Sequence, residues 1–168
     1  TAPPPFMRLM SSDGRRGWAA VVDAGVFAFD VQSLQVQQHL DVRAPSGDGD
    51  YGIVRNLALL IDRWLYLARV REGLDEYDTQ TGIRTSYYPQ GGLPYPVIKE
   101  LAISPDGRLL FASADPDGLG PADIRAPLLF EVPGLRLRYA FPPRPGRISD
   151  AAVFHPDGDF QDRLVPAG

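Results

Sequence analysis

The sequence predicts an all-β protein built from repeated units of antiparallel strands. Glycine and proline each account for 17 of the 168 residues, a content that disfavours a helical bundle. No stretch sustains the 3.6-residue hydrophobic period of an amphipathic helix. A short apolar strand followed by a tight, aspartate-containing turn recurs along the chain at intervals of about 50 residues.

The recurring strand and turn are clearest in residues 101–113 and 151–158, which both contain Pro-Asp-Gly. In such a turn proline restricts φ, aspartate caps the backbone, and glycine accepts the left-handed conformation. Residues 7–14 and 57–63 are more divergent copies of the same pattern. The copies place the turn aspartates at Asp13, Asp62, Asp106 and Asp157.

Three further strands are predicted in each unit. The second strands are apolar and lie at 18–22, 64–68 and 109–113. The third strands end in an acidic residue that follows an aromatic one, at 26–30, 74–78 and 128–131. The fourth strands are the most polar, as expected for an outer edge where polar side chains discourage pairing with another sheet. They lie at 35–40, 83–88 and 136–141.

Four-stranded units of this length are the blades of a β-propeller, so the sequence predicts a single partial propeller over residues 1–168. The predicted blades are 6–49, 50–97 and 98–148, and residues 149–168 begin a fourth. Aromatic residues on the inner strands are predicted to fill the core between blades. They are Trp18, Trp64, Phe111 and Phe154.

Three motifs resemble those of known propellers: residues 101–113, the Tyr-Asp-Thr-Gln-Thr-Gly of 77–82, and residues 153–158. Through them the chain resembles the YVTN and WD-repeat class of β-propellers. The resemblance implies blades of four antiparallel strands, and its motifs are structural rather than catalytic. Propellers close with four to eight blades, so three blades and part of a fourth leave the ring open. The chain is therefore expected either to be a fragment of a longer protein or to share its ring with a second copy or another protein.

Composition and charge exclude several classes of protein. With no cysteine, the chain has no disulfide and no thiolate metal site. Its net charge of −4 disfavours a nucleic-acid partner. No apolar run reaches the roughly 20 residues of a membrane span, and no signal peptide is present, so the compartment stays open between cytoplasmic and exported. His39 and His155 are predicted to be structural, and no catalytic residue, metal site or cofactor is expected.

Two loops are candidates for a binding surface, because function often lies on loops over a rigid scaffold. Residues 115–123 and 69–73 join the second and third strands of adjacent blades, which places both loops on one face. The candidate binding residues are Arg69, Arg71, Asp115, Asp117, Asp123 and Arg125. An ordinary solvated loop is the alternative for both segments, and a calcium site is a further alternative for the aspartate-rich one.

These observations predict a non-enzymatic scaffold, or a subunit of a larger complex, that presents its loops to another protein. Two alternatives stay open. The chain is part of a propeller enzyme, similar to a lactonase, a hydrolase or the β subunit of a quinone-dependent dehydrogenase, whose site needs further blades. Or it is an extracytoplasmic module that binds carbohydrate or the cell envelope.

Overall fold

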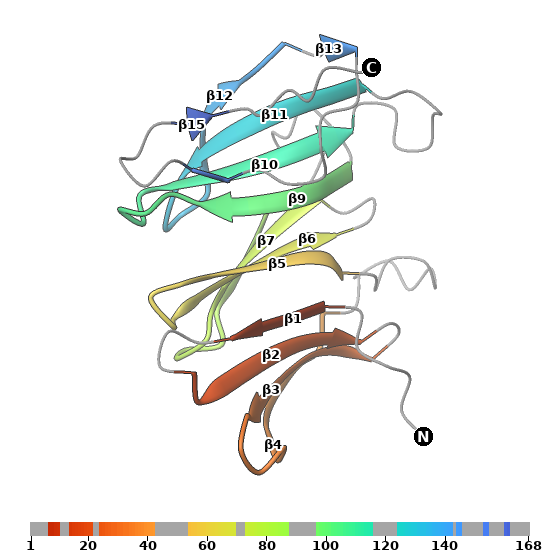
Figure 1. The fold of residues 1–168 in the computed structure, drawn as a ribbon, viewed down its shortest axis with the longest axis vertical. Coiled ribbons are helices and arrows are strands. Elements are labelled where there is room, and N and C mark those ends of the chain that lie inside the picture. Colours follow the sequence, from red (N-terminus) through yellow and green to blue (C-terminus); the bar gives the residue numbers. More distant parts are fainter. Residues whose placement is uncertain are drawn as a thin grey trace.

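The protein is described by a computed structural model in which every regular element is a strand (Figure 1). The structure describes residues 7–10, 14–21, 24–42, 54–69, 73–87, 97–115, 124–142, 144–145, 153–154 and 160–161. Within these ranges the chain forms three antiparallel sheets of four or five strands and one two-stranded pair, and contains no helix, which confirms the all-β prediction.

The three sheets follow one another along the chain, and strands that are consecutive in sequence pair within each sheet. The first sheet comprises β1 (Met7–Met10), β2 (Arg16–Val21), β3 (Gly25–Asp30) and β4 (Val36–Leu40). The second comprises β5 (Val54–Leu60), β6 (Trp64–Arg69), β7 (Gly73–Asp78) and β8 (Arg84–Tyr87). The third comprises β9 (Val97–Ile103), β10 (Leu109–Asp115), β11 (Ile124–Glu131) and β12 (Arg136–Ala140), with β13 (Arg144–Pro145) paired to β11. A short pair follows, β14 (Val153–Phe154) and β15 (Phe160–Gln161).

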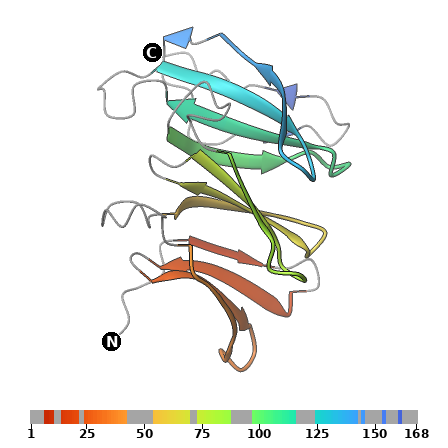
Figure 2. The same cartoon turned by 180° about the vertical axis from the view of Figure 1, so that it is seen from behind.

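The sheets stack in sequence order along the long axis of the molecule, as the two opposite views show (Figures 1 and 2). Neighbouring sheets meet mainly through their first strands, with β1 against β5 and β5 against β9. Strand β6 also contacts β9. The second sheet is therefore covered on both faces.

Strand β6 shows how the sequence supports burial on both faces. Leu65 and Leu67 belong to the core between the first and second sheets, whereas Tyr66 and Ala68 belong to the core between the second and third. All four are fully buried. Successive side chains of a strand point to opposite faces, so a strand with a sheet on each side needs an unbroken apolar run.

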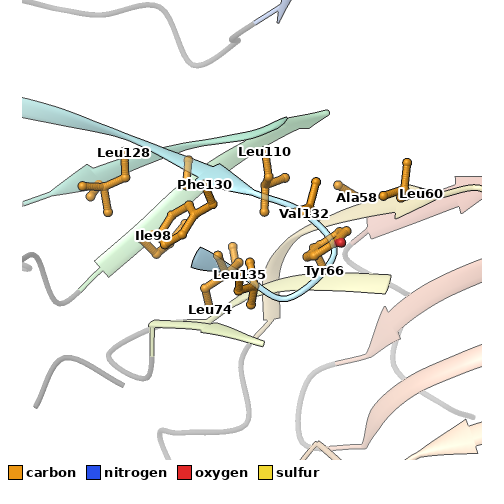
Figure 3. Packing of buried hydrophobic residues seen from close by; sticks show 13 residues of the cluster. Ala58, Leu60, Tyr66, Leu74, Ile98, Leu110, Leu128, Phe130, Val132 and Leu135 are labelled. Atoms are coloured by element: carbon orange, nitrogen blue, oxygen red, sulfur yellow. The ribbon is translucent and has the colours of Figure 1, made fainter. Parts of the chain in front are cut away.

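The core between the second and third sheets is built from the facing strands and one turn (Figure 3). Ile98, Leu110 and Leu128 of the third sheet face Leu74 and Tyr66 of the second. The turn between β11 and β12 adds Val132 and Leu135 to the same core. These two side chains of the turn therefore pack between the two sheets, while Pro133 and Gly134 at its centre are exposed.

The sheets share one pattern of turn hydrogen bonds. In each sheet the third strand ends in an acidic residue. The residue that follows it donates its backbone N–H to the carbonyl of an arginine in the turn between the first and second strands of the same sheet. The pairs are Val31 to Arg15 at 2.9 Å, Thr79 to Arg63 at 2.9 Å and Val132 to Arg108 at 3.0 Å. Corresponding residues can therefore be aligned between sheets from the structure itself.

The Pro-Asp-Gly turn after β9 forms as its residue types require. Asp106 Oδ1 accepts hydrogen bonds from the Ser104 hydroxyl at 2.6 Å and from the Arg108 N–H at 3.0 Å. Gly107 has φ of +68°, and a Cβ there would collide with the Leu60 side chain of the second sheet. The turn thus lies directly beside the β5–β6 turn. The corresponding aspartates Asp13 and Asp157 lie outside the described residues.

Candidate interaction surface

An ion pair is fully buried between the first and second sheets. Arg69 is the last residue of β6 and is fully buried, and its Nε lies 2.6 Å from Oδ2 of Asp75 on β7. A second guanidinium, that of Arg84 on β8, lies 3.2 Å from the same oxygen. The Arg69 guanidinium also donates to the carbonyl of Val42, so this cluster joins the second sheet to the first.

The prediction that Arg69 belongs to an exposed loop surface is wrong. Strand β6 runs through Arg69, which pairs with Gly73 at the end of the β6–β7 hairpin. The side chain lies on the face of the sheet that packs against the first sheet, where Asp75 offsets the cost of burying the charge. The Arg69–Asp75 pair is fully buried, so we assign it to sheet packing.

The structure does not show whether the remaining predicted binding residues lie close together. Arg71, Asp117 and Asp123 lie outside the described residues. Asp115 is the last residue of β10 and Arg125 is the second residue of β11, and the structure describes only the backbone of these two residues. Their proposed grouping therefore stays a prediction.

The core between the second and third sheets contains polar contacts of a different kind. Glu76 of β7 accepts a hydrogen bond from the Gly134 N–H at 2.8 Å, and the Tyr87 hydroxyl donates to the Gly134 carbonyl at 3.3 Å. Asn56 of β5 donates to Glu100 of β9 at 2.7 Å. Burial, followed by the charge of Glu76, raises the pKa of the Tyr66 phenol well above its usual range. The hydrogen bonds to Gly134 and Glu100 therefore connect the two sheets at partly buried or exposed positions.

A metal ion would need a cluster of side chains that can bind it within the described ranges. No group of three or more histidine, cysteine, aspartate or glutamate residues that could hold a metal ion occurs there. Among the same residues, no helix is long and apolar enough to cross a membrane.

His39 stacks on Phe27, with ring centroids 4.5 Å apart, and its Nε2 lies 2.7 Å from the Ala24 carbonyl.

The β5–β6, β7–β8, β9–β10 and β11–β12 turns lie along one edge of the stack, on the left in Figure 1 and on the right in Figure 2. Apolar side chains are exposed in the turns of the second sheet at this edge. We call this the turn edge, and on the second sheet it comprises Ile61 in the β5–β6 turn and Ile83 before β8. Their exposed fractions are 81% and 65%. The hydrogen bond from Thr79 to Arg63 holds these two turns together.

The turn that carries Ile61 has an unfavourable backbone for this residue. Ile61 and Asp62 have φ of +50° and +52°, and the Arg63 N–H donates to the Leu60 carbonyl at 3.1 Å. A turn with two positive φ values favours glycine, asparagine and aspartate, whereas a β-branched residue there is strained. Such strain is often retained where a side chain has a function, so it makes Ile61 a functional candidate.

Asp78 and Asp30, two charged groups along the turn edge, already have partners in the same or the neighbouring turn. Asp78 accepts bonds from Arg63 at 2.8 and 3.2 Å, and this arginine holds the pKa of the Asp78 carboxyl far below its usual range. Asp30 accepts from the N–H groups of Gln32 and Ser33 at 3.0 and 2.7 Å, and the Ser33 contacts lower the pKa of Asp30. Around Ile61 and Ile83 the turn edge therefore offers apolar contact more readily than new ion pairs.

Sequence reasoning missed the turn edge because it weighted charged loop residues. The signal was present as aliphatic residues in turns that polar residues usually occupy, at Leu34, Ile61 and Ile83. Their exposure depends on whether a neighbouring sheet covers the turn, so the sequence alone did not identify them.

Comparison with known proteins supports the fold and no more. No protein-family model and no curated protein matches this sequence. Among solved structures, the fold is similar to the extracellular domain of a protein described as a hybrid two-component system from B. thetaiotaomicron. The TM-score is 0.59 at 12% sequence identity, and the match covers 80% of this chain but only 16% of that one.

Proposed function

We propose that the protein is an interaction scaffold of the β-propeller type, in which stacked four-stranded sheets hold the turn edge rigid for another protein to bind. The observation that carries this proposal is Ile61, which is 81% exposed on a strained turn that is hydrogen-bonded to the turn before the exposed Ile83. Exposed apolar groups that cluster on a soluble protein are a mark of interaction sites. The stacking of the sheets through their first strands supports the propeller part of the proposal.

Binding at this edge gains from rigidity. The Arg63–Asp78 pair and the hydrogen bond between the two turns order the backbone before a partner arrives. A pre-ordered surface loses less conformational entropy on association, so more of the apolar contact contributes to affinity. Because Arg63 and Asp78 already pair with each other, contact at Ile61 and Ile83 depends on apolar burial and responds weakly to salt.

Within the described residues, no observation favours the enzymatic or the carbohydrate-binding alternative. Both stay predictions from the resemblance to known propellers.

Site-specific photo-crosslinking tests the scaffold proposal. A photoreactive residue at position 61 or 83 is expected to crosslink a discrete protein in extracts of the source cells, and Ile61→Asp is expected to abolish the crosslink from position 83. The matched control places the same residue at Ala140, which is exposed at the end of β12 that is remote from the turn edge. Equal crosslinking from all three positions, or none from 61 and 83, would contradict the proposal.

A further inference from the structure

The second and third sheets carry an arginine at corresponding turn positions, Arg63 and Arg108. Each arginine precedes the second strand of its sheet, and its backbone carbonyl accepts a hydrogen bond from the residue after the third strand. In both sheets the acidic residue that ends the third strand, Asp78 or Glu131, lies opposite the residue that follows this arginine. The two sheets therefore place an arginine and a carboxylate at the same points of the same turns.

The carboxylate is used differently in the two sheets. In the second sheet Asp78 pairs with Arg63, and the guanidinium nitrogen and carboxylate oxygen are 2.8 Å apart. In the third sheet Glu131 pairs instead with Arg136, the first residue of β12, whose Nε donates to it at 2.9 Å. Arg136 follows its acid by five residues, and the residue five after Asp78 is the uncharged Ile83. This one difference decides which arginine the carboxylate binds.

Arg108 is consequently exposed, and its guanidinium forms no ion pair within the part of the chain that the structure describes. Asp106 lies in the same turn, but its Oδ1 accepts from the Ser104 hydroxyl and from the Arg108 backbone N–H. An exposed charge without a partner inside the protein is available to a charged group of another molecule.

Arg108 lies beside the apolar part of the turn edge. A Cβ on Gly107 would collide with the side chain of Leu60, so the residues that precede Arg108 and Ile61 lie against each other. The β5–β6 and β9–β10 turns are neighbours at this edge in both views (Figures 1 and 2). The edge therefore presents an exposed aliphatic residue and an exposed cation on adjacent turns.

The third sheet also has an excess of positive charge at this edge. Among the described residues of its two turns and the start of β12, three arginines accompany two carboxylates: Arg108, Arg136 and Arg138 with Asp106 and Glu131. The whole chain has a net charge of −4, so this part of the edge is opposite in sign to the molecule. Such a local field favours an acidic segment over a basic one.

We propose that the turn edge binds an acidic, apolar peptide segment of its partner protein, in which a carboxylate pairs with Arg108 and a neighbouring apolar side chain contacts Ile61. This inference rests on the proposed function and adds the chemistry of the partner. Apolar contact supplies affinity, whereas the ion pair orients the segment and selects against basic sequences.

A random peptide library displayed on phage, with the purified chain as the immobilised target, tests this inference. We expect enriched peptides to carry aspartate or glutamate next to apolar residues. They should lose binding to Ile61→Asn, which removes the aliphatic group without adding charge and suits the left-handed backbone.

One enriched peptide is then synthesised in two forms, with its acidic residue and with the corresponding amide. Fluorescence anisotropy measures the affinity of each form for the wild-type chain and for Arg108→Gln. We expect Arg108→Gln to weaken binding of the acidic peptide about tenfold, as loss of a close interfacial charge pair does, and to leave the amide form unchanged.

Arg138→Gln is the matched control. It removes the same charge from an exposed arginine, but on β12, at the opposite edge of the third sheet from β9. It should weaken the acidic peptide by less than about twofold, because an exposed charge outside the contact contributes little. Both arginines are exposed, so both variants should keep the wild-type circular dichroism spectrum.

The outcomes separate this inference from the proposed function. Enriched peptides without acidic residues, or equal losses in Arg108→Gln and Arg138→Gln, would overturn the inference and leave the proposed function intact. Enriched peptides that bind Ile61→Asn as tightly as the wild type, or a library that yields no binding peptide, would contradict the proposed function and the inference with it.

Discussion

The second sheet has two interfaces, and they are completed by different chemistry. Toward the first sheet, a fully buried Arg69–Asp75 ion pair lies beside the apolar core and reaches across to the Val42 carbonyl. Toward the third sheet, the core is apolar at its centre, and the β11–β12 turn closes it with Leu135 and with a hydrogen bond from the Gly134 N–H to Glu76. The interface with the first sheet therefore depends on a buried pair of opposite charges, whereas the interface with the third sheet depends mainly on apolar packing.

The largest effect is expected at the ion pair. Replacing Asp75 with alanine leaves the Arg69 guanidinium buried without its carboxylate, which should lower the free energy of unfolding by about 3–5 kcal/mol. Urea denaturation followed by circular dichroism measures this loss. The double variant Arg69→Met with Asp75→Leu removes both charges and should recover much of it. A loss below about 1 kcal/mol for Asp75→Ala would show that this interface does not depend on the pair.

A smaller effect is expected at the packed turn. Leu135→Ala should cost about 2–5 kcal/mol, because it opens a cavity in the core between the second and third sheets. Leu34→Ala is the matched control, since Leu34 has the same backbone conformation but is exposed, and it should change stability by less than about 0.5 kcal/mol. Equal losses in the two variants would mean that the turns do not differ in burial as described.

The smallest effect is expected on the stability at alkaline pH. Each of the two interfaces contains one buried tyrosine, Tyr66 toward the third sheet and Tyr77 toward the first. Burial raises the pKa of Tyr66, and the Glu76 charge raises it further, whereas Arg84 opposes the effect of burial on the pKa of Tyr77. A raised folded-state pKa gives stability that is present below the unfolded value of 10.0 and is lost as the pH rises above it. Thermal melts between pH 8 and 11 should therefore show a flatter decline for Tyr66→Phe than for Tyr77→Phe. The opposite order would contradict the assignment.

Much of the fold could be predicted because it depends on local patterns. The strands, their order and the Pro-Asp-Gly turn after β9 followed from alternation and turn residues, and the expected core positions Trp18 and Phe111 are buried. The candidate site was predicted less well. Arg69 was assigned to a loop because a charged residue at a strand end is usually solvated, and its acidic partner was not apparent from spacing alone.

The sequence by itself determined the all-β class and the approximate positions of the main strands, because backbone propensity and side-chain alternation act over a few residues. Only the tertiary structure decided which equivalent residues are buried. Leu34 and Leu135 occupy matching turns with matching backbones, but one is exposed and the other buried. Burial depends on a neighbouring sheet from a distant part of the chain, and no local pattern encodes whether that neighbour is present.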